Sequence, residues 1–179
     1  MTIMADRPLI LIIYTSRGGN TEALARAIAE GAAEAGNRNV DVAVKRAGDV
    51  ERRDIERASA VAFGSPTYYS YMSGELKALF DDALPYRDAF YQKPGVAFAT
   101  GNGGQLKCIQ SIEGILEFFE LLLVQRSDII SAGLAVQGRP GAGDMEKAKA
   151  AGRKLGDSGV EYACRRGSEG ITIGKTPGH

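Results

Sequence analysis

Short apolar runs alternate along this chain with stretches whose apolar residues recur every three or four positions. The run Leu9–Tyr14 is almost wholly aliphatic, and further short runs follow at 40–44, 60–63, 95–99 and 129–136. Runs of this length predict strands, most of them buried inside a sheet. Helical spacing between the runs predicts helices at 21–35, 49–57, 75–83, 105–124 and 144–162. Strands that alternate with helices favour a parallel sheet covered on both faces, the doubly wound α/β class.

The predicted elements fill one domain, because 179 residues without an internal repeat or a linker suit a single core. We place this domain at 8–163, between a leader at 1–7 and a polar tail at 164–179. The apolar run that follows Arg7 is too short for a signal sequence or a membrane span. We therefore expect a cytoplasmic protein that does not contact a membrane.

Charge and histidine content exclude several function classes. The 22 basic and 22 acidic residues give no net charge, which argues against nucleic-acid binding through bulk charge. His179 is the only histidine, so Ser-His-Asp triads, Cys-His dyads and histidine-ligated metal sites are absent. Cys108 and Cys164 are too few for a disulfide framework and suit a reducing compartment.

Three glycine-bearing loops follow predicted strands, at the sheet edge where ligands bind in this fold class. The first loop, 15–22, carries Gly18 and Gly19 between hydroxyl residues and leads into a helix. Backbone N–H groups and the helix dipole can bind an anion there. The alternative is an ordinary turn with Asn20 or Thr21 as the helix cap. The loop matches neither the Walker A pattern nor the dinucleotide fingerprint.

The second and third loops suggest a planar ligand. Tyr68, Tyr69 and Tyr71 in loop 64–74 can stack on a flat ring, unless they only cover the neighbouring helix. Loop 100–105 is rich in glycine, so it is either a flexible turn or a source of backbone N–H donors. A phosphorylated planar heterocycle fits the three loops together, and FMN is the obvious candidate.

The same loops carry a resemblance to known flavoproteins. Residues 14–22 read YTSRGGNTE, which resembles the phosphate loop of the flavodoxin-like family. Residues 64–69 and 72–77 read GSPTYY and MSGELK, and resemble the second flavin loop of WrbA-type quinone reductases and NADPH-dependent FMN reductases. Residues 100–105 read TGNGGQ and are similar to the third WrbA-type loop. The resemblance implies a three-layer flavodoxin-like fold with five parallel strands in the order 2-1-3-4-5.

The resemblance also assigns FMN contacts to individual residues. The phosphate would be held by the first loop, at Ser16, Arg17, Gly19, Asn20 and Thr21. Gly18 belongs to the same loop but stands where flavodoxins commonly carry a threonine. The isoalloxazine and ribityl groups would meet Pro66, Thr67, Tyr68 and Tyr69, and the pyrimidine edge would meet Thr100, Gly101, Asn102, Gly103 and Gly104. Ser70 and Tyr71 replace the Gly-Asn that is usual in WrbA-type proteins.

These assignments imply an oxidoreductase in which the flavin carries the chemistry, without a catalytic side chain or a metal. We expect NAD(P)H as the electron donor and a quinone-like acceptor. The alternatives are a flavodoxin-type electron carrier that serves protein partners, and a flavin-binding regulator without catalysis. The absence of net charge weighs against a carrier, because acidic faces steer basic redox partners.

Two surface features complete the expectations. On the predicted helix 105–124, Phe118, Leu121 and Val124 would point away from the core, which suggests a homodimer or homotetramer. The alternative is that the C-terminal tail covers these side chains. Arg46 belongs with the charged residues of 51–56 to a mixed-charge surface.

Overall fold

The computed structural model describes residues 7–124 and 134–169. Its strands are β1 (Leu9–Tyr14), β2 (Asp41–Arg46), β3 (Ala58–Pro66), β4 (Pro94–Gly101), β5 (Leu122–Leu123) and β6 (Ala135–Gln137). Its α-helices are α1 (Asn20–Ala32), α2 (Arg52–Arg57), α3 (Gly74–Ala83), α4 (Gln105–Phe118) and α5 (Ala142–Glu169). Short 3-10 turns are η1 (Ala35–Arg38), η2 (Ala47–Asp49) and η3 (Leu84–Phe90).

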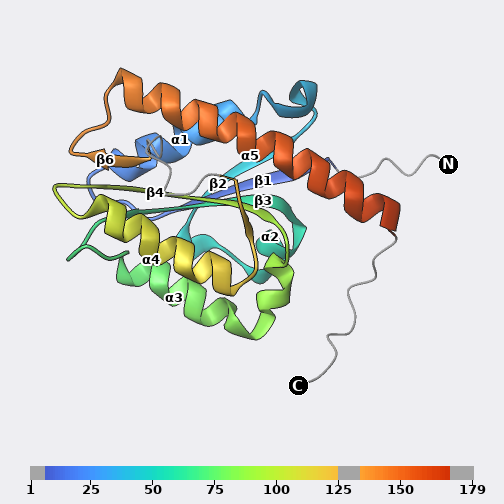
Figure 1. Ribbon diagram of the computed structural model, residues 1–179, viewed down its shortest axis with the longest axis horizontal. Helices are drawn as coiled ribbons and strands as arrows, with labels where there is room; N and C mark the ends of the chain where they lie inside the picture. Colours follow the sequence, from blue (N-terminus) through green and yellow to red (C-terminus); the bar gives the residue numbers. More distant parts are fainter. Residues whose placement is uncertain (1–6, 125–133, 170–179) are drawn as a thin grey trace.

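The strands form one parallel sheet in the order β2-β1-β3-β4-β5, as predicted. Helices α1 and α5 cover one face, whereas α3 and α4 cover the other (Figure 1). The three-layer arrangement and the strand order predicted from the sequence are therefore confirmed. Loops after β1, β3 and β4 leave from the same edge, because the strands are parallel.

The outer side of β4 is shared by two short strands. β5 pairs with Pro94 and Gly95 at the start of β4, and β6 pairs with Ala99–Gly101 at its end. The sequence predicted one strand at 129–136 for this position. Residues 129–133 lie outside the described part of the chain, and β6 occupies Ala135–Gln137.

The predicted helix 105–124 is too long, since α4 ends at Phe118. Glu120 takes a left-handed backbone conformation with φ of 60°. The N–H of Leu121 then bonds back to the carbonyl of Leu116 at 2.9 Å, which closes the helix. Leu121 consequently packs into the core and is 6% exposed, so its predicted outward position is wrong. Val124 is partly buried against the core as well, so its predicted outward position is also wrong. Phe118 does point outward and is 63% exposed.

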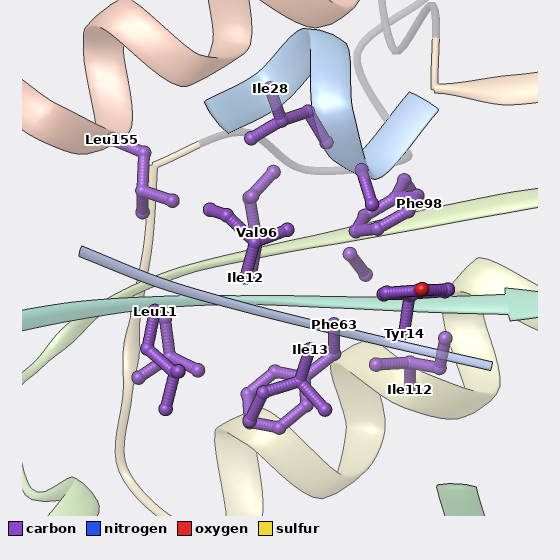
Figure 2. Close-up of a cluster of buried hydrophobic side chains, with 14 of the residues drawn as sticks. Leu11, Ile12, Ile13, Tyr14, Ile28, Phe63, Val96, Phe98, Ile112 and Leu155 are labelled. Atoms are coloured by element: carbon purple, nitrogen blue, oxygen red, sulfur yellow. The ribbon is translucent and has the colours of Figure 1, made fainter. Parts of the chain in front are cut away.

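The core is built on both faces of β1, where every side chain is buried. Ile12 points to the face covered by Ile28 and Leu155, and Ile13 points to the opposite face, toward Phe63 and Ile112 (Figure 2). This alternation is what a strand inside a parallel sheet requires. The apolar run read from the sequence therefore becomes the centre of the fold.

Helices α1 and α5 pack backbone against backbone. A Cβ atom added at Gly31 would lie 1.9 Å from the Lys149 carbonyl oxygen, and one added at Gly152 would lie 2.0 Å from that of Ile28. Only glycine fits at these crossings. Helix α5 also continues through Glu169, beyond its predicted end at 162. None of the helices in the described ranges combines the length and the apolar character needed to cross a membrane.

Candidate functional site

The three predicted loops meet at the carboxyl edge of the sheet, where hydroxyl pairs join them. Thr15 Oγ1 lies 2.7 Å from Ser73 Oγ, which joins the first loop to the second. Thr21 Oγ1 lies 2.8 Å from Thr100 Oγ1, which joins the start of α1 to the end of β4. Both pairs are buried, so they fix the loops relative to one another.

Helix α1 begins without a side-chain cap. Its N-cap residue is Gly19, at φ of 86°, and the Ser16 hydroxyl accepts only the Gly19 N–H, at 3.1 Å. Within residues 7–124 and 134–169 no acceptor is found for the remaining N–H groups of this loop and of the first helical turn, which belong to Ser16, Arg17, Gly18, Asn20, Thr21 and Glu22. Such a group of unpaired donors is typical of an anion site.

The one carboxylate in this first turn is already paired. Glu22 accepts a 2.7 Å hydrogen bond from Arg26 Nη2, and this bond lowers the pKa of Glu22, assisted by the charges of Arg26 and Arg46. The Glu22 side chain therefore remains anionic and turned toward Arg26. It does not cap the free N–H groups of α1.

The second loop ends in a strained two-residue turn. Tyr68 and Tyr71 exchange two backbone hydrogen bonds of 2.9 Å, and Tyr69 and Ser70 between them have φ of 52° and 63°. Residues with a Cβ atom seldom adopt these angles, at a cost of about 1 kcal/mol each. Tyr69 is fully exposed at the tip. The Arg17 guanidinium lies 5.4 Å from the centre of the Tyr68 ring, so the turn lies beside the first loop.

The third loop packs against the second at two glycines. A Cβ atom at Gly101 would approach Thr67 Cβ to 2.8 Å, and one at Gly104 would approach Ser70 Oγ to 2.3 Å. Gly104 is also the N-cap of α4, at φ of 74°, again without a side-chain cap. Loop 100–105 is therefore a close-packed turn with a second uncapped helix start.

One buried polar atom in this region is unsatisfied. Thr67 Oγ1 has no hydrogen-bond partner in the described part of the chain. Nearby, Cys108 lies wholly buried behind the second loop, and burial raises the pKa of its thiol. Side-chain hydrogen bonding to Thr67 and Ser65 opposes this rise without outweighing it, so the thiol is kept protonated. The thiol is a weak hydrogen-bonding group, so the Thr67 hydroxyl can still bond a stronger partner.

The structure brings most of the predicted residues together but gives some of them other partners. The hydroxyls of Thr21 and Thr100 bond each other, so one of the two O–H groups is already used and only the other can still donate to a ligand. Asn102 and Gly103 are exposed at the tip of the third loop. Backbone N–H groups, more than hydroxyls, are therefore the free donors of the first loop.

Two residues of the site were not predicted from the sequence. Ser73 caps α3 by accepting the Leu76 N–H at 3.3 Å, and its hydroxyl also bonds Thr15. Arg46 donates to the Ser16 carbonyl at 3.0 Å, so its assignment to a mixed-charge surface is incomplete. The sequence did offer one indication of this role for Arg46. Arg46 ends the strand beside β1 and pairs in register with Tyr14, so it lies next to the start of the first loop.

Comparison with known proteins places the fold and its loops in context. A family model described as flavodoxin matches residues 12–166. A flavodoxin from Clostridium saccharobutylicum is 31% identical over 134 residues, covering 73% of this chain and 77% of its own length. An NAD(P)H dehydrogenase (quinone) from Methylocella silvestris is 32% identical over 155 residues, covering 73% of this chain and 74% of its own length.

A solved structure agrees with the sheet topology. The flavodoxin, WrbA-like protein from Agrobacterium tumefaciens superposes with a TM-score of 0.68 at 21% identity, covering 87% of this chain and 99% of that one. The resemblance first read from three loop motifs is thereby confirmed, and it extends over nearly the whole described chain. With its 2-1-3-4-5 sheet, its uncapped α1 and the family match across residues 12–166, this chain belongs to the flavodoxin family.

Proposed function

We propose that this protein binds FMN and uses NAD(P)H to reduce quinone-like acceptors by two electrons. The observation that carries the proposal is the exposed aromatic turn 68–71 beside the uncapped start of α1. An anion site next to exposed aromatic rings suits a phosphorylated flavin and a flat second substrate. Relatives named NAD(P)H dehydrogenase (quinone) support the reaction class.

Membership of the flavodoxin family implies FMN, and the residues present fit it. The free N–H groups would receive the phosphate in the loop formed by Ser16, Arg17, Gly18, Gly19, Asn20 and Thr21. Thr67 Oγ1, buried without a partner, suits a hydroxyl or carbonyl of the cofactor. The Gly101 and Gly104 contacts let the third loop approach the second closely, as a narrow flavin slot would need.

Bound FMN supplies hydride transfer, so this chain need only bind, orient and admit substrates. Arg17 fixes the Tyr68 ring through its cation–π contact, and the backbone bonds of the turn hold Tyr69 outward. Tyr69 and Tyr71, fully and 44% exposed, offer aromatic surface to a nicotinamide or a quinone. The two substrates would use this surface in turn.

The second candidate is a flavodoxin-type electron carrier without NAD(P)H activity of its own. It is favoured by relatives named flavodoxin at similar identity. The balance of 22 basic and 22 acidic residues weighs against it, because steering of a basic partner needs a charge excess. We therefore rank the enzyme first.

Anaerobic stopped-flow spectroscopy separates the two candidates. The protein saturated with FMN is mixed with NADH or with NADPH, and flavin absorbance near its visible maximum is followed. If the protein is an NAD(P)H-dependent enzyme, one of the nucleotides should bleach the flavin absorbance. Benzoquinone added afterwards should then restore that absorbance. If dithionite bleaches the flavin but neither nucleotide does, the protein has no NAD(P)H activity of its own, and the proposed reaction would be wrong.

A further inference from the structure

Arg46 is the last residue of β2, and its guanidinium lies behind the first loop. Its Nη2 donates to the Ser16 carbonyl oxygen at 3.0 Å, while the guanidinium carbon lies 5.7 Å from the centre of the Tyr14 ring. The loop carbonyl and the ring thus hold the guanidinium from two sides. A guanidinium that both donates and stacks is fixed more firmly than a lysine would be.

The charge of Arg46 is not cancelled by a carboxylate. Its neighbour Lys45 points to the other side of the strand and pairs with Asp54 at 2.7 Å. Arg46 has no such ion pair within the described ranges, and the nearby Glu22 is bound by Arg26. The charge of Arg46 still reaches the first turn of α1, because it helps to lower the pKa of Glu22, after the Arg26 hydrogen bond and the Arg26 charge.

The hydrogen bond to Ser16 also orients one peptide group. In a trans peptide the carbonyl and the following N–H point in opposite directions. With the Ser16 carbonyl turned to Arg46, the Arg17 N–H is turned away from it, and no acceptor for that N–H occurs among the described residues. The hydrogen bond from Arg46 to the Ser16 carbonyl therefore orients the Arg17 N–H as one donor of the anion site.

We propose that Arg46 is a positioning residue for the cofactor phosphate: it fixes the Ser16–Arg17 peptide and adds positive potential at the start of α1. The inference rests on the proposed FMN binding but not on the proposed reaction. It predicts that Arg46 acts on the phosphate of the ligand and leaves the flavin ring system unaffected. Riboflavin, which lacks the phosphate, is therefore the matched probe.

The test measures FMN and riboflavin dissociation constants by quenching of flavin fluorescence, for apoprotein with and without Arg46→Met. Methionine keeps an unbranched apolar stem against Tyr14 but removes the donor and the charge. FMN affinity should fall about tenfold, the effect expected for a hydrogen bond from a charged donor. Riboflavin affinity should change less than about twofold. Added salt should weaken FMN binding to the wild type more than to the variant.

Two further variants complete the design. Arg46→Lys keeps the charge and should recover part of the lost FMN affinity. Arg57→Met removes a cation that pairs with Asp41 at the opposite end of β2, and should leave both affinities unchanged. Circular dichroism verifies that each variant is folded, and if Arg46→Met is not, Arg46→Lys alone must still show the selective loss.

The outcomes are distinct. Equal weakening of FMN and riboflavin would make Arg46 a structural residue, and unchanged FMN affinity would remove its role altogether. A wild type that binds FMN but is not reduced by NAD(P)H would contradict the proposed reaction while leaving the Arg46 inference intact. A wild type that binds neither flavin would overturn both.

Discussion

Gly104 lies directly against Ser70: a Cβ atom at Gly104 would come within 2.3 Å of Ser70 Oγ and 3.0 Å of Ser70 Cα. The two residues belong to different loops of the site, and both have positive φ. The start of α4 therefore supports the strained turn that carries Tyr69. Each loop restricts the conformation of the other.

Gly104→Ala should lower the free energy of unfolding by about 2 kcal/mol, for two reasons. The new Cβ atom would clash with Ser70, and alanine is strained at the positive φ of this position. Urea denaturation followed by circular dichroism measures the change. Adding Ser70→Gly should restore part of the loss, since it removes the atoms in the way. Gly114→Ala is the control within α4: nothing lies within 4 Å of its Cβ position, so it should stabilise by about 0.5–1 kcal/mol. Equal effects of the two substitutions would contradict the contact.

Tyr69→Ala should raise the apparent KM for the quinone severalfold while changing FMN affinity little. The side chain is fully exposed, so its loss removes substrate surface without opening the core. Steady-state assays with NAD(P)H and flavin titration separate the two quantities. Tyr69→Phe keeps the ring and should behave as the wild type. A matching loss of FMN affinity would instead assign Tyr69 to cofactor binding.

Gly152→Ala should destabilise the fold by about 1–3 kcal/mol, although alanine favours helix more than glycine does. The added methyl would press on the Ile28 carbonyl in the crossing of α1 and α5. Gly143→Ala, near the start of the same helix with open space around it, should be neutral or slightly stabilising. Thermal unfolding of both variants provides the comparison, and a neutral Gly152→Ala would mean that the helices can separate at no cost.

Lys93 should make stability rise with pH between about 7 and 10.5. It is completely buried, and burial lowers its pKa from 10.5 to about 7, although its Nζ donates to the Ile55 and Glu56 carbonyls at the end of α2. Burial lowers the pKa of Lys93 most, and the positive charge of Arg166 lowers it further. The negative charge of Glu56, which is paired with Arg52, acts in the opposite direction but is the smallest of the three effects.

The sign follows from proton counting. In the pH window between the two pKa values the unfolded chain holds the Lys93 proton and the folded chain does not, so raising the pH favours the folded state. The slope contributed by Lys93 should approach about 1.4 kcal/mol per pH unit. Denaturation of wild type and Lys93→Met across this window isolates it, because the other titrating groups cancel in the difference. Parallel curves would show that the lysine stays charged when folded.

Association of two or more copies remains a prediction from exposed apolar side chains. Phe118 and Leu122, 63% and 44% exposed, lie close together in the chain at the end of α4 and in β5. Light scattering at micromolar concentration should give a mass above the 19.0 kDa of one chain. Phe118→Glu should return it to one chain. A wild type of 19.0 kDa would contradict the prediction.

The sequence predicts the inner strands well because their pattern depends on burial alone. Leu9–Tyr14 forms β1 with the predicted bounds. A short, continuous aliphatic run is stable as a strand that is buried on both faces of a sheet. The end of α4 could not be predicted in this way. Glu120 adopts the left-handed conformation that usually marks a glycine, and the leucines after it continue the helical spacing. Leu122 and Leu123 form a strand because they pair with β4, and the local sequence does not indicate that pairing.

The residues of the site likewise fall into those that local sequence identifies and those that only the assembled sheet brings into place. Loop composition identified the glycines and tyrosines, because special backbone angles and exposed rings have compositional signals. Arg46 and Ser73 entered the site through strand register and through a hydrogen bond between distant loops. Such contacts follow from the assembled sheet, so a reading confined to each loop could not find them.

The two hydroxyl pairs of the site also set an order of events during synthesis. Thr15 is separated from Ser73 by 58 positions, and Thr21 from Thr100 by 79. A ribosome therefore completes the first loop long before it has made Ser73 and Thr100, which hold that loop in place. Contacts so distant in sequence form late, after the intervening loops have closed. Acquisition of flavin should accordingly mark the end of folding in the nascent chain, and flavin added early should find no site to bind.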